Sequence, residues 1–259
     1  MPYSKIICET RGDVAIIRLD DGKTLNAASP EMAGELRDAL HEVCASSRAL
    51  ILTGTGRGFC SGANLGGLDV GAPDYDAGAV LATHYSPLML QLRALPIPFI
   101  TAVNGPAAGL GCALALAADL VVAAEGSYFL QAFRRIGLVP DGGSAFLLTR
   151  AAGRARAMEM MLLGDKIPAV KALEWGLINR VVPANALDDT ALALAGELAA
   201  GPTKALSAIR KMCWDALETG FAPQLDSERV LQRDAGRTAD HREGVAAFLE
   251  KRPARFTGS

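Results

Sequence analysis

The segment from Pro98 to Asp119, with the sequence PFITAVNGPAAGLGCALALAAD, constrains the fold more than any other part of the chain. Phe99–Val103 is a short apolar run rich in β-branched residues, which predicts a buried strand. Asn104–Pro106 ends that strand, because glycine and proline break regular structure. From Leu110 onward, small and apolar residues run for over two turns with almost no charge, which predicts a helix that is buried all round.

The glycines between this strand and helix allow two interpretations. Gly109 and Gly111 let the backbone turn tightly and leave room for another group to approach. The first N–H groups of a helix have no intrahelical partner, so they can receive a developing negative charge on a bound molecule. In the alternative, the glycines only allow the helix to pack closely on the strand. The segment alone leaves both interpretations open.

Length and composition predict one large domain, or one domain with a small appendage, because the chain has 259 residues and half of them are hydrophobic. The net charge is −2 and there is no run of Lys or Arg, which argues against nucleic acid as a partner. Met1–Asp13 has no apolar core of a signal peptide. The longest apolar run, Gly109–Ala118, is about half the length that spans a bilayer. We therefore expect no membrane association and a cytoplasmic location.

Neither a metal site nor a nucleotide site is predicted. The five cysteines and three histidines are scattered, and no two cysteines have metal-ligand spacing, so we expect buried free thiols. The glycine-rich stretch GTGRGFCSGANLGGL does not match the dinucleotide pattern G-x-G-x-x-G. Gly22-Lys23-Thr24 resembles the end of a Walker A motif, but its required first glycine would fall at Ile17.

Predicted strands and helices alternate to about residue 182, and only helices follow. Besides those above, we expect strands at Ile6–Glu9, Val14–Leu19, Ala49–Thr53, Leu120–Ala123, Tyr128–Leu130 and Leu177–Val182. We expect helices that start at Pro30 with Ser29 as the cap, and at Tyr85–Leu95, Ala145–Ala151 and Gly153–Leu163, the last with Ala155, Met158 and Leu162 inward. This order predicts an α/β fold with a C-terminal helical extension.

Four motifs, in this order, are similar to those of a known superfamily. They are GRGFCSGANL after a strand, AVNGPAAGLGCALALAADL, FLQAFRRIGLVPDGGSAFLLTRAAG, and EWGLINRVV after a helix. Over roughly residues 5–259 the chain thus resembles the crotonase, or enoyl-CoA hydratase/isomerase, superfamily. The resemblance implies a crotonase-like spiral of ββα units and an acyl-CoA thioester as substrate. Coenzyme A is then part of the substrate, and no separate cofactor is expected.

The same resemblance implies how the chain is divided and assembled. Residues 1–200 are expected to form the spiral core with the acyl-CoA site. Residues 201–259 are expected to form a helical region that mediates trimerisation. The expected assembly is a homotrimer or a dimer of trimers.

In this superfamily two backbone N–H groups stabilise a thioester enolate. The resemblance assigns these donors to Ala63, after the glycine of FCSGA, and to Leu110, in the middle of GLG. Since only the N–H is needed, the leucine side chain does not abolish the role. The segment Ala63–Leu65 is expected to bind the adenine end of CoA through its backbone. The full set of expected substrate-binding residues is Ala63, Asn64, Leu65, Gly109, Leu110, Phe133 and Leu138.

Hydratases of the superfamily carry two glutamates, and this chain has Ala113 and Phe133 at those positions. Neither side chain can transfer a proton, which water addition requires. Asp141, in VPDGG, is the carboxylate that remains in the motifs. Its local sequence is typical of a turn or helix-cap aspartate. The resemblance instead makes it a catalytic residue, because 2-(1,2-epoxy-1,2-dihydrophenyl)acetyl-CoA isomerases have an aspartate there.

Three hypotheses about function follow. The first is an acyl-CoA isomerase that moves a double bond or opens a ring epoxide by proton transfer through Asp141. The second is an enoyl-CoA hydratase of fatty-acid oxidation, and the third is a weakly active acyl-CoA-binding paralogue. A dehalogenase ranks low, because those relatives pair the aspartate with a tryptophan where this chain has Phe133.

Overall fold

A six-stranded sheet forms the centre of the computed structural model, which describes residues 3–66 and 69–259. Its strand order is β1-β2-β3-β4-β6-β9, and every neighbouring pair is parallel except β1 with β2. The strands are β1 (Ile6–Arg11), β2 (Val14–Leu19), β3 (Ala49–Gly54), β4 (Phe99–Val103), β6 (Leu120–Ala124) and β9 (Arg180–Val182). The alternation of strands and helices thus produces the predicted α/β class.

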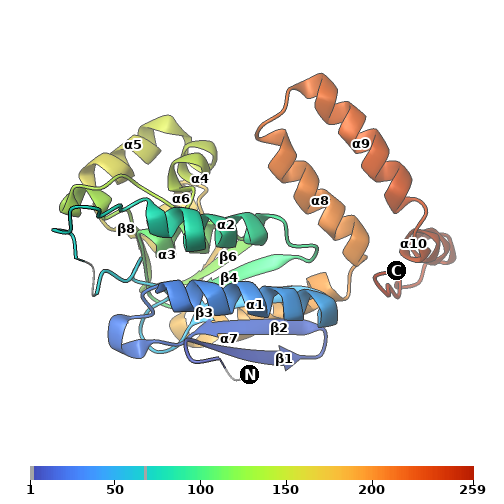
Figure 1. Cartoon of the computed structure of the whole chain (residues 1–259). Helices are drawn as coiled ribbons and strands as arrows, with labels where there is room; N and C mark the ends of the chain where they lie inside the picture. The colour runs from blue at the N-terminus through green and yellow to red at the C-terminus, as the bar shows by residue number, and fades with distance from the viewer. Residues whose placement is uncertain (1–2, 67–68) are drawn as a thin grey trace.

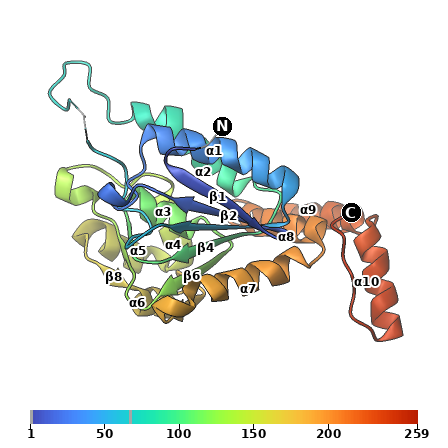
Figure 2. The same ribbon diagram turned by 90° about the horizontal axis from the view of Figure 1, so that it is seen from below.

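Both faces of this sheet are buried, because successive side chains along a strand point to opposite sides. On β2, Val14 and Ile16 pack against α7 (Leu187–Ala199), whereas Ala15 and Ile17 face α1 (Pro30–Ser46) and the larger core. Figure 2 shows the sheet between α1 and α2 (Ser86–Arg93) on one side and α7 on the other. Continuous apolar runs such as β3, in which every residue is buried, follow from this arrangement.

A smaller sheet of three strands lies beside the central one, in the order β5-β7-β8. It comprises β5 (Pro106–Ala108), β7 (Tyr128–Leu130) and β8 (Ile167–Pro168). The sequence predicted only β7. Strands of two or three residues are too short to show an alternating pattern, so β5 and β8 were not predictable from periodicity.

Helices connect and cover the two sheets (Figure 1). The α-helices between β5 and β9 are α3 (Leu110–Leu116), α4 (Ser144–Ala151), α5 (Gly153–Leu163) and α6 (Ala169–Glu174). The predicted start of α1 is confirmed, since the Ser29 side chain accepts a hydrogen bond from the backbone N–H of Met32 and Pro30 is the first helical residue. Among the residues described, no helix is long and apolar enough to cross a membrane.

Three expectations were wrong in detail. In α5 it is Ala157 and Met160 that are buried, whereas Ala155, Met158 and Leu162 are exposed. Apolar residues lie all round this helix, so spacing could not identify the inner face. The last strand covers only Arg180–Val182, because Gly176 and Leu177 close the turn after α6. Helix α3 is buried as predicted but ends after seven residues, just short of two turns.

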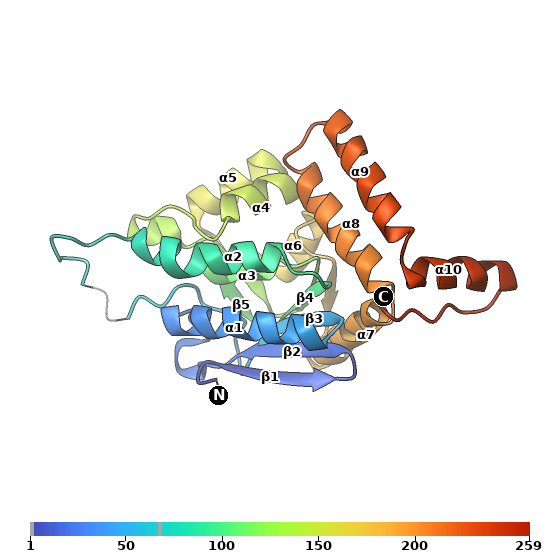
Figure 3. The same cartoon turned by 45° about the vertical axis from the view of Figure 1, so that its right-hand side comes forward.

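The C-terminal helices α8 (Thr203–Ala216), α9 (Phe221–Ala235) and α10 (Ala239–Glu250) form an arm at one end of the molecule. Figures 1 and 3 show α9 packed along α8, and α10 projecting from the body. The arm starts just after Gly201-Pro202, close to the predicted boundary at residue 201. The division into a core and a trimerising region stays a prediction.

Arg210 on α8 links the C-terminal arm to the rest of the molecule through hydrogen bonds. Its buried guanidinium donates through Nε to Asp119 Oδ2 at 2.5 Å, through Nη2 to the Leu92 carbonyl at 3.2 Å, and through Nη1 to the Leu95 carbonyl. Asp119 Oδ2 also accepts the backbone N–H of Phe99 at 2.7 Å. Burial raises the pKa of Asp119, and the positive charge of Arg210 opposes that shift.

Replacing Arg210 by methionine should lower the free energy of unfolding by about 3 kcal/mol, because it leaves the Asp119 carboxylate buried without its partner. Denaturant unfolding followed by circular dichroism measures this. The exposed Arg229 on α9 is the control, and Arg229→Met should change stability by less than about 0.5 kcal/mol. Equal stability of the two variants would contradict the assigned role of Arg210.

Candidate active site

The loop that carries Ala63 lies against the turn before α3. Gly62 has φ +112°, and a Cβ added there would lie 3.1 Å from the carbonyl oxygen of Ala108. A Cβ added at Gly109 would likewise lie 3.8 Å from the Cα of Gly62. A side chain at Gly62 would therefore crowd the turn, whereas the distance at Gly109 is an ordinary van der Waals contact that shows how closely the loop and the turn pack. The two expected N–H donors, Ala63 and Leu110, immediately follow these two glycines in the sequence.

The peptide that carries the Ala63 N–H is held by Ala28. The Gly62 carbonyl accepts the Ala28 N–H at 2.8 Å, and the Ala28 carbonyl accepts the Asn64 N–H at 2.9 Å. In a planar trans peptide the N–H points opposite to the carbonyl. The Ala63 N–H therefore points away from Ala28, and it donates to no acceptor among the residues that the structure describes.

The Leu110 N–H is the first of α3, where no intrahelical acceptor exists. The preceding carbonyl, that of Gly109, accepts the N–H groups of Cys112 at 3.0 Å and Ala113 at 3.3 Å. The Leu110 N–H thus points out of the helix end, and it too lacks an acceptor within residues 3–66 and 69–259. Gly109 adopts φ +52°, a left-handed conformation that favours glycine.

Asp141 supplies a partly buried carboxylate near this region. Its Oδ1 is buried and has no hydrogen-bond partner among the described residues. Burial raises the pKa of Asp141 to about 6, because the charged form loses its hydration. The Asp141 carbonyl accepts the N–H of Ser144 at 2.9 Å, which fixes the turn before α4. The helix-cap interpretation is not supported for its side chain, since the N-cap of α4 is Gly143 and has no side-chain bond.

The turn after Asp141 sits directly on α3. A Cβ added at Gly142 would lie 2.8 Å from both the Ala113 Cβ and the Leu110 Cδ1. The fully buried Ala113 is one of the two positions where hydratases carry glutamate. In this chain the backbone of Gly142 occupies the space beside it, so the side chains of Ala113 and Leu110 form a seat for the Asp141–Gly142 turn.

Tyr85 is a site residue that the sequence did not single out. Its buried side chain donates through Oη to the carbonyl of Ala28 at 2.7 Å. Burial, and next the negative charge of Asp141, raise the pKa of Tyr85 to about 12. Tyr85 ends a π-helical turn, Leu81–Tyr85, that leads into α2. Such turns are common at functional sites but leave no clear sequence pattern.

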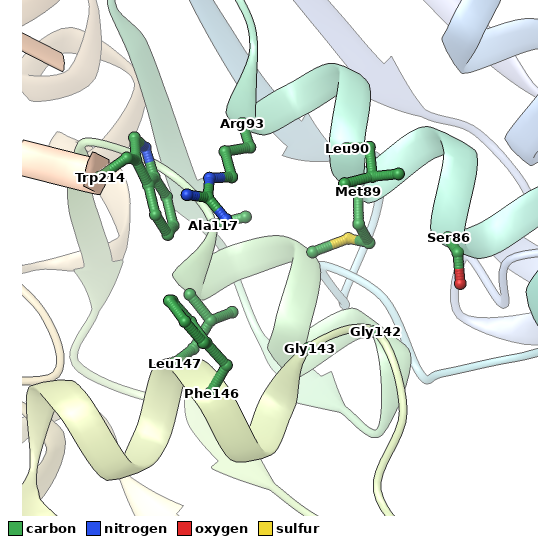
Figure 4. A pocket seen from close by; sticks show the side chains of 10 residues that line it. All are labelled: Ser86, Met89, Leu90, Arg93, Ala117, Gly142, Gly143, Phe146, Leu147 and Trp214. Carbon is green, nitrogen blue, oxygen red and sulfur yellow. The ribbon is translucent and has the colours of Figure 1, made fainter. Parts of the chain in front are cut away.

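A cavity of about 280 Å³ begins beside the Gly142–Gly143 turn that precedes α4 (Figure 4). Its walls come from α2, α4 and α8. Arg93 lies beside the rings of Phe146 and Trp214, with its Cζ 5.8 and 5.2 Å from their centroids. Arg93 also pairs with Glu218 at 2.6 Å. The lining residues are Ser86, Met89, Leu90, Arg93, Ala117, Gly142, Gly143, Phe146, Leu147 and Trp214.

The structure brings some of the expected substrate-binding residues together and leaves others apart. The buried ring of Phe133 covers the turn before α3, with its Cζ 3.5 Å from a Cβ added at Gly109. Asn64 bonds the backbone N–H of Gly66 through Oδ1 at 2.9 Å. Leu65 and Leu138 are 52% and 41% exposed.

Metal-binding residues do not gather in the described part of the chain, where no three His, Cys, Asp or Glu side chains could hold an ion together. All five cysteines are free, but the expectation of buried thiols holds only for Cys60 and Cys112, whose pKa values burial raises. Cys44 is partly buried, and Cys8 and Cys213 are exposed. The fold and the site define an α/β protein in which two backbone N–H groups have no acceptor among the described residues and a carboxylate of raised pKa lies nearby.

The chain belongs to the enoyl-CoA hydratase/isomerase family, whose model matches residues 9–259. It is 45% identical over 258 residues to a probable enoyl-CoA hydratase of Rhodobacter capsulatus, covering 100% of both chains. It is also 45% identical over 257 residues to the 1,2-epoxyphenylacetyl-CoA isomerase of Escherichia coli, covering 98% of each. Equal identity to proteins with these two names leaves the specific reaction undecided.

Solved structures confirm the crotonase-like fold. A putative enoyl-CoA hydratase of Streptomyces coelicolor superposes with a TM-score of 0.93 at 33% identity, covering 100% of this chain and 96% of the other. An enoyl-CoA hydratase of Geobacillus kaustophilus superposes with a TM-score of 0.92 at 32% identity, covering 99% of each. The family and fold that the four motifs predicted are therefore correct.

A comparison of Gly142 with Gly143 tests whether the turn after Asp141 packs tightly against α3. Both have positive φ, +59° and +79°, but only at Gly142 does an added Cβ meet other atoms within 4 Å. Gly143→Ala should therefore cost only the backbone strain, about 1 kcal/mol of unfolding free energy. Gly142→Ala should cost that strain and a further 1–3 kcal/mol, roughly, from overpacking. Denaturant titration of both variants measures the difference, and equal costs would show that Gly142 is not held against α3.

Proposed function

We propose that this chain is an acyl-CoA isomerase that forms a thioester enolate and moves a proton through Asp141. The observation that carries the proposal is the state of Asp141: a partly buried carboxylate with an unpartnered oxygen and a raised pKa. Two backbone N–H groups that have no acceptor within residues 3–66 and 69–259 lie on adjacent turns nearby. A base and a pair of oxyanion donors are the groups that enolate formation requires.

In the proposed reaction, the thioester oxygen accepts the N–H groups of Ala63 and Leu110. Asp141 removes a proton from the α carbon, or from the γ carbon of an unsaturated chain. The C–H bonding electrons delocalise onto the thioester oxygen, where the two donors stabilise the charge. The protonated carboxyl then returns the proton at another carbon, which moves the double bond and restores the thioester. One carboxylate suffices, because after accepting the proton it is itself the acid.

An epoxide substrate fits the same scheme. Removal of the α proton supplies the electrons that break a neighbouring C–O bond of the epoxide, and the ring oxygen takes up a proton. The 45%-identical relative from Escherichia coli is named for such a substrate, 1,2-epoxyphenylacetyl-CoA. Because Asp141 needs to act only as a base in the first step, no second carboxylate is required.

The hydratase alternative is less favoured by the side chains. Water addition needs one group that deprotonates water and one that protonates the α carbon. The two positions that carry glutamates in hydratases hold Ala113 and Phe133, both buried. The Ala113 side chain faces Gly142, where an added Cβ would lie 2.8 Å from the Ala113 Cβ, so the turn after Asp141 packs closely beside this position. The weakly active paralogue is less favoured because the raised pKa of Asp141 gives the site a working base.

The acyl part of the substrate is proposed to enter the cavity beside Gly142 and Gly143. Its walls are mainly apolar, and Glu218 neutralises the charge of Arg93. Its volume of about 280 Å³ is near the lower end of the range for ligand pockets. A compact neutral acyl group, such as one with a six-membered ring, suits that space better than a long chain or a dicarboxylic acid.

We further propose a homotrimer or a dimer of trimers. The arm exposes large apolar side chains that a lone subunit would leave in water, among them Phe221 at 81% and Phe248 at 82% exposure. Exposed apolar surface on a projecting element is typical of a subunit interface. The proposed location remains cytoplasmic, and no separate cofactor is part of the proposed reaction.

Asp141→Asn tests the proposed base. The substitution keeps the shape of the side chain and removes its basicity, so isomerase turnover should fall by about a hundredfold or more. Substrate binding and thermal stability should change little. Asp189→Asn, at an exposed position on α7, is the control and should retain full activity. Turnover is followed chromatographically with enoyl-CoA and epoxide substrates. Full activity of Asp141→Asn would exclude Asp141 as the base.

The raised pKa of Asp141 predicts the pH dependence. The carboxylate must be ionised to accept a proton, so kcat/KM of the wild-type protein should rise with pH and level off above a midpoint near 6. An ordinary, well-hydrated aspartate would place that midpoint near 4. Initial rates between pH 4 and 8 locate it. A rate that is already constant at pH 5 would contradict the effect of burial on this group.

A further inference from the structure

Tyr85 is hydrogen-bonded to the residue that holds the loop of Ala63. Tyr85 is 2% exposed, and its hydroxyl donates to the Ala28 carbonyl at 2.7 Å. Ala28 in turn bonds the loop on both sides of Ala63, through the Gly62 carbonyl and the Asn64 N–H. The negative charge of Asp141 also helps to raise the pKa of Tyr85. One side chain therefore contacts the residue that supports an expected donor.

We propose that Tyr85 is a positioning residue that fixes the direction of the Ala63 N–H through its hydrogen bond to Ala28. The inference rests on the proposed function, in which that N–H stabilises the thioester enolate. Oxyanion donors act well only when they are oriented before the reaction, so a support that limits their motion lowers the barrier. The hydroxyl itself does not touch the reacting atoms.

The protonation state of Tyr85 supports this role. With a pKa of about 12, the phenol stays neutral at any ordinary working pH and keeps its proton for the Ala28 carbonyl. That carbonyl already accepts the Asn64 N–H, and a carbonyl oxygen can accept two hydrogen bonds. Removing the hydroxyl thus leaves the carbonyl with one partner, so the change weakens the support without leaving a buried group unpaired.

Tyr85→Phe is the variant that removes only this bond, because it conserves the volume of the ring. Tyr128→Phe is its control, since Tyr128 is half-buried, lies under Lys166, and has no hydroxyl hydrogen bond among the residues described. Two measurements are made on both variants: steady-state kinetics, and the infrared stretching frequency of the thioester carbonyl in a bound, ¹³C-labelled acyl-CoA. The carbonyl frequency falls when N–H donors polarise the bond, so it reports the donors directly.

In Tyr85→Phe we expect the carbonyl frequency to move back towards that of the free thioester. We also expect kcat to fall about tenfold, less than the loss of a whole donor, while KM changes by less than about twofold. Tyr128→Phe should match the wild type in both measurements. An unchanged frequency and kcat in Tyr85→Phe would overturn the inference. So would unfolding of the variant, because the hydroxyl would then serve the fold and not the donor.

The wild-type spectrum separates this inference from the proposed function. If bound acyl-CoA shows no carbonyl shift in the wild type, the two N–H groups do not receive the thioester and the proposed function fails. If the wild type shows the shift and Tyr85→Phe retains it in full, only the role of Tyr85 fails.

Discussion

Close approach of two backbones holds the site together. The loop after β3 and the segment around β5 bond through Cys60 N–H to the Pro106 carbonyl at 3.0 Å and Ala108 N–H to the Cys60 carbonyl at 2.9 Å. No side chain fits between them, since a Cβ at Gly111 would lie 2.2 Å from the Cys60 carbonyl oxygen. Glycine is therefore required there. Because these hydrogen bonds hold the two backbones together, the N–H groups of Ala63 and Leu110, which follow them in the chain, keep a fixed position relative to each other.

The packing of Gly142 on α3 suits the proposed reaction with a single carboxylate. In that proposal Leu110 provides a donor with its backbone, and its side chain contacts the turn that carries Asp141, so the proposed base and oxyanion donor share one support. Ala113 completes that support, in the place where a hydratase would need a glutamate. The small side chain at position 113 is thus part of how Asp141 is held, and the loss of the hydratase residues and the placement of the aspartate belong to one arrangement.

The sequence predicted more of the fold than of the contacts that hold the expected site residues in place. Glycine turns, strand–helix alternation and the Ser29-Pro30 cap depend on local chemistry, so β4, α3 and the start of α1 were predictable. The inner face of α5 was not, because its apolar residues lie all round the helix. Of the site, motif resemblance indicated Ala63, Leu110 and Asp141, whose roles stay proposals. Tyr85 could not be found that way, because its proposed role depends on a hydrogen bond to Ala28, 57 residues away in the chain.

In the proposed reaction this site makes a thioester enolate with one base and does not add water. To test this, the wild-type protein is incubated in D₂O with phenylacetyl-CoA, which has no double bond to move, and separately with crotonyl-CoA. We expect deuterium at the α carbon of phenylacetyl-CoA by mass spectrometry and NMR, and only background formation of 3-hydroxybutyryl-CoA. Hydration of crotonyl-CoA at ordinary enzyme rates, roughly 10 per second, with no α deuteration of phenylacetyl-CoA, would exclude the proposed reaction.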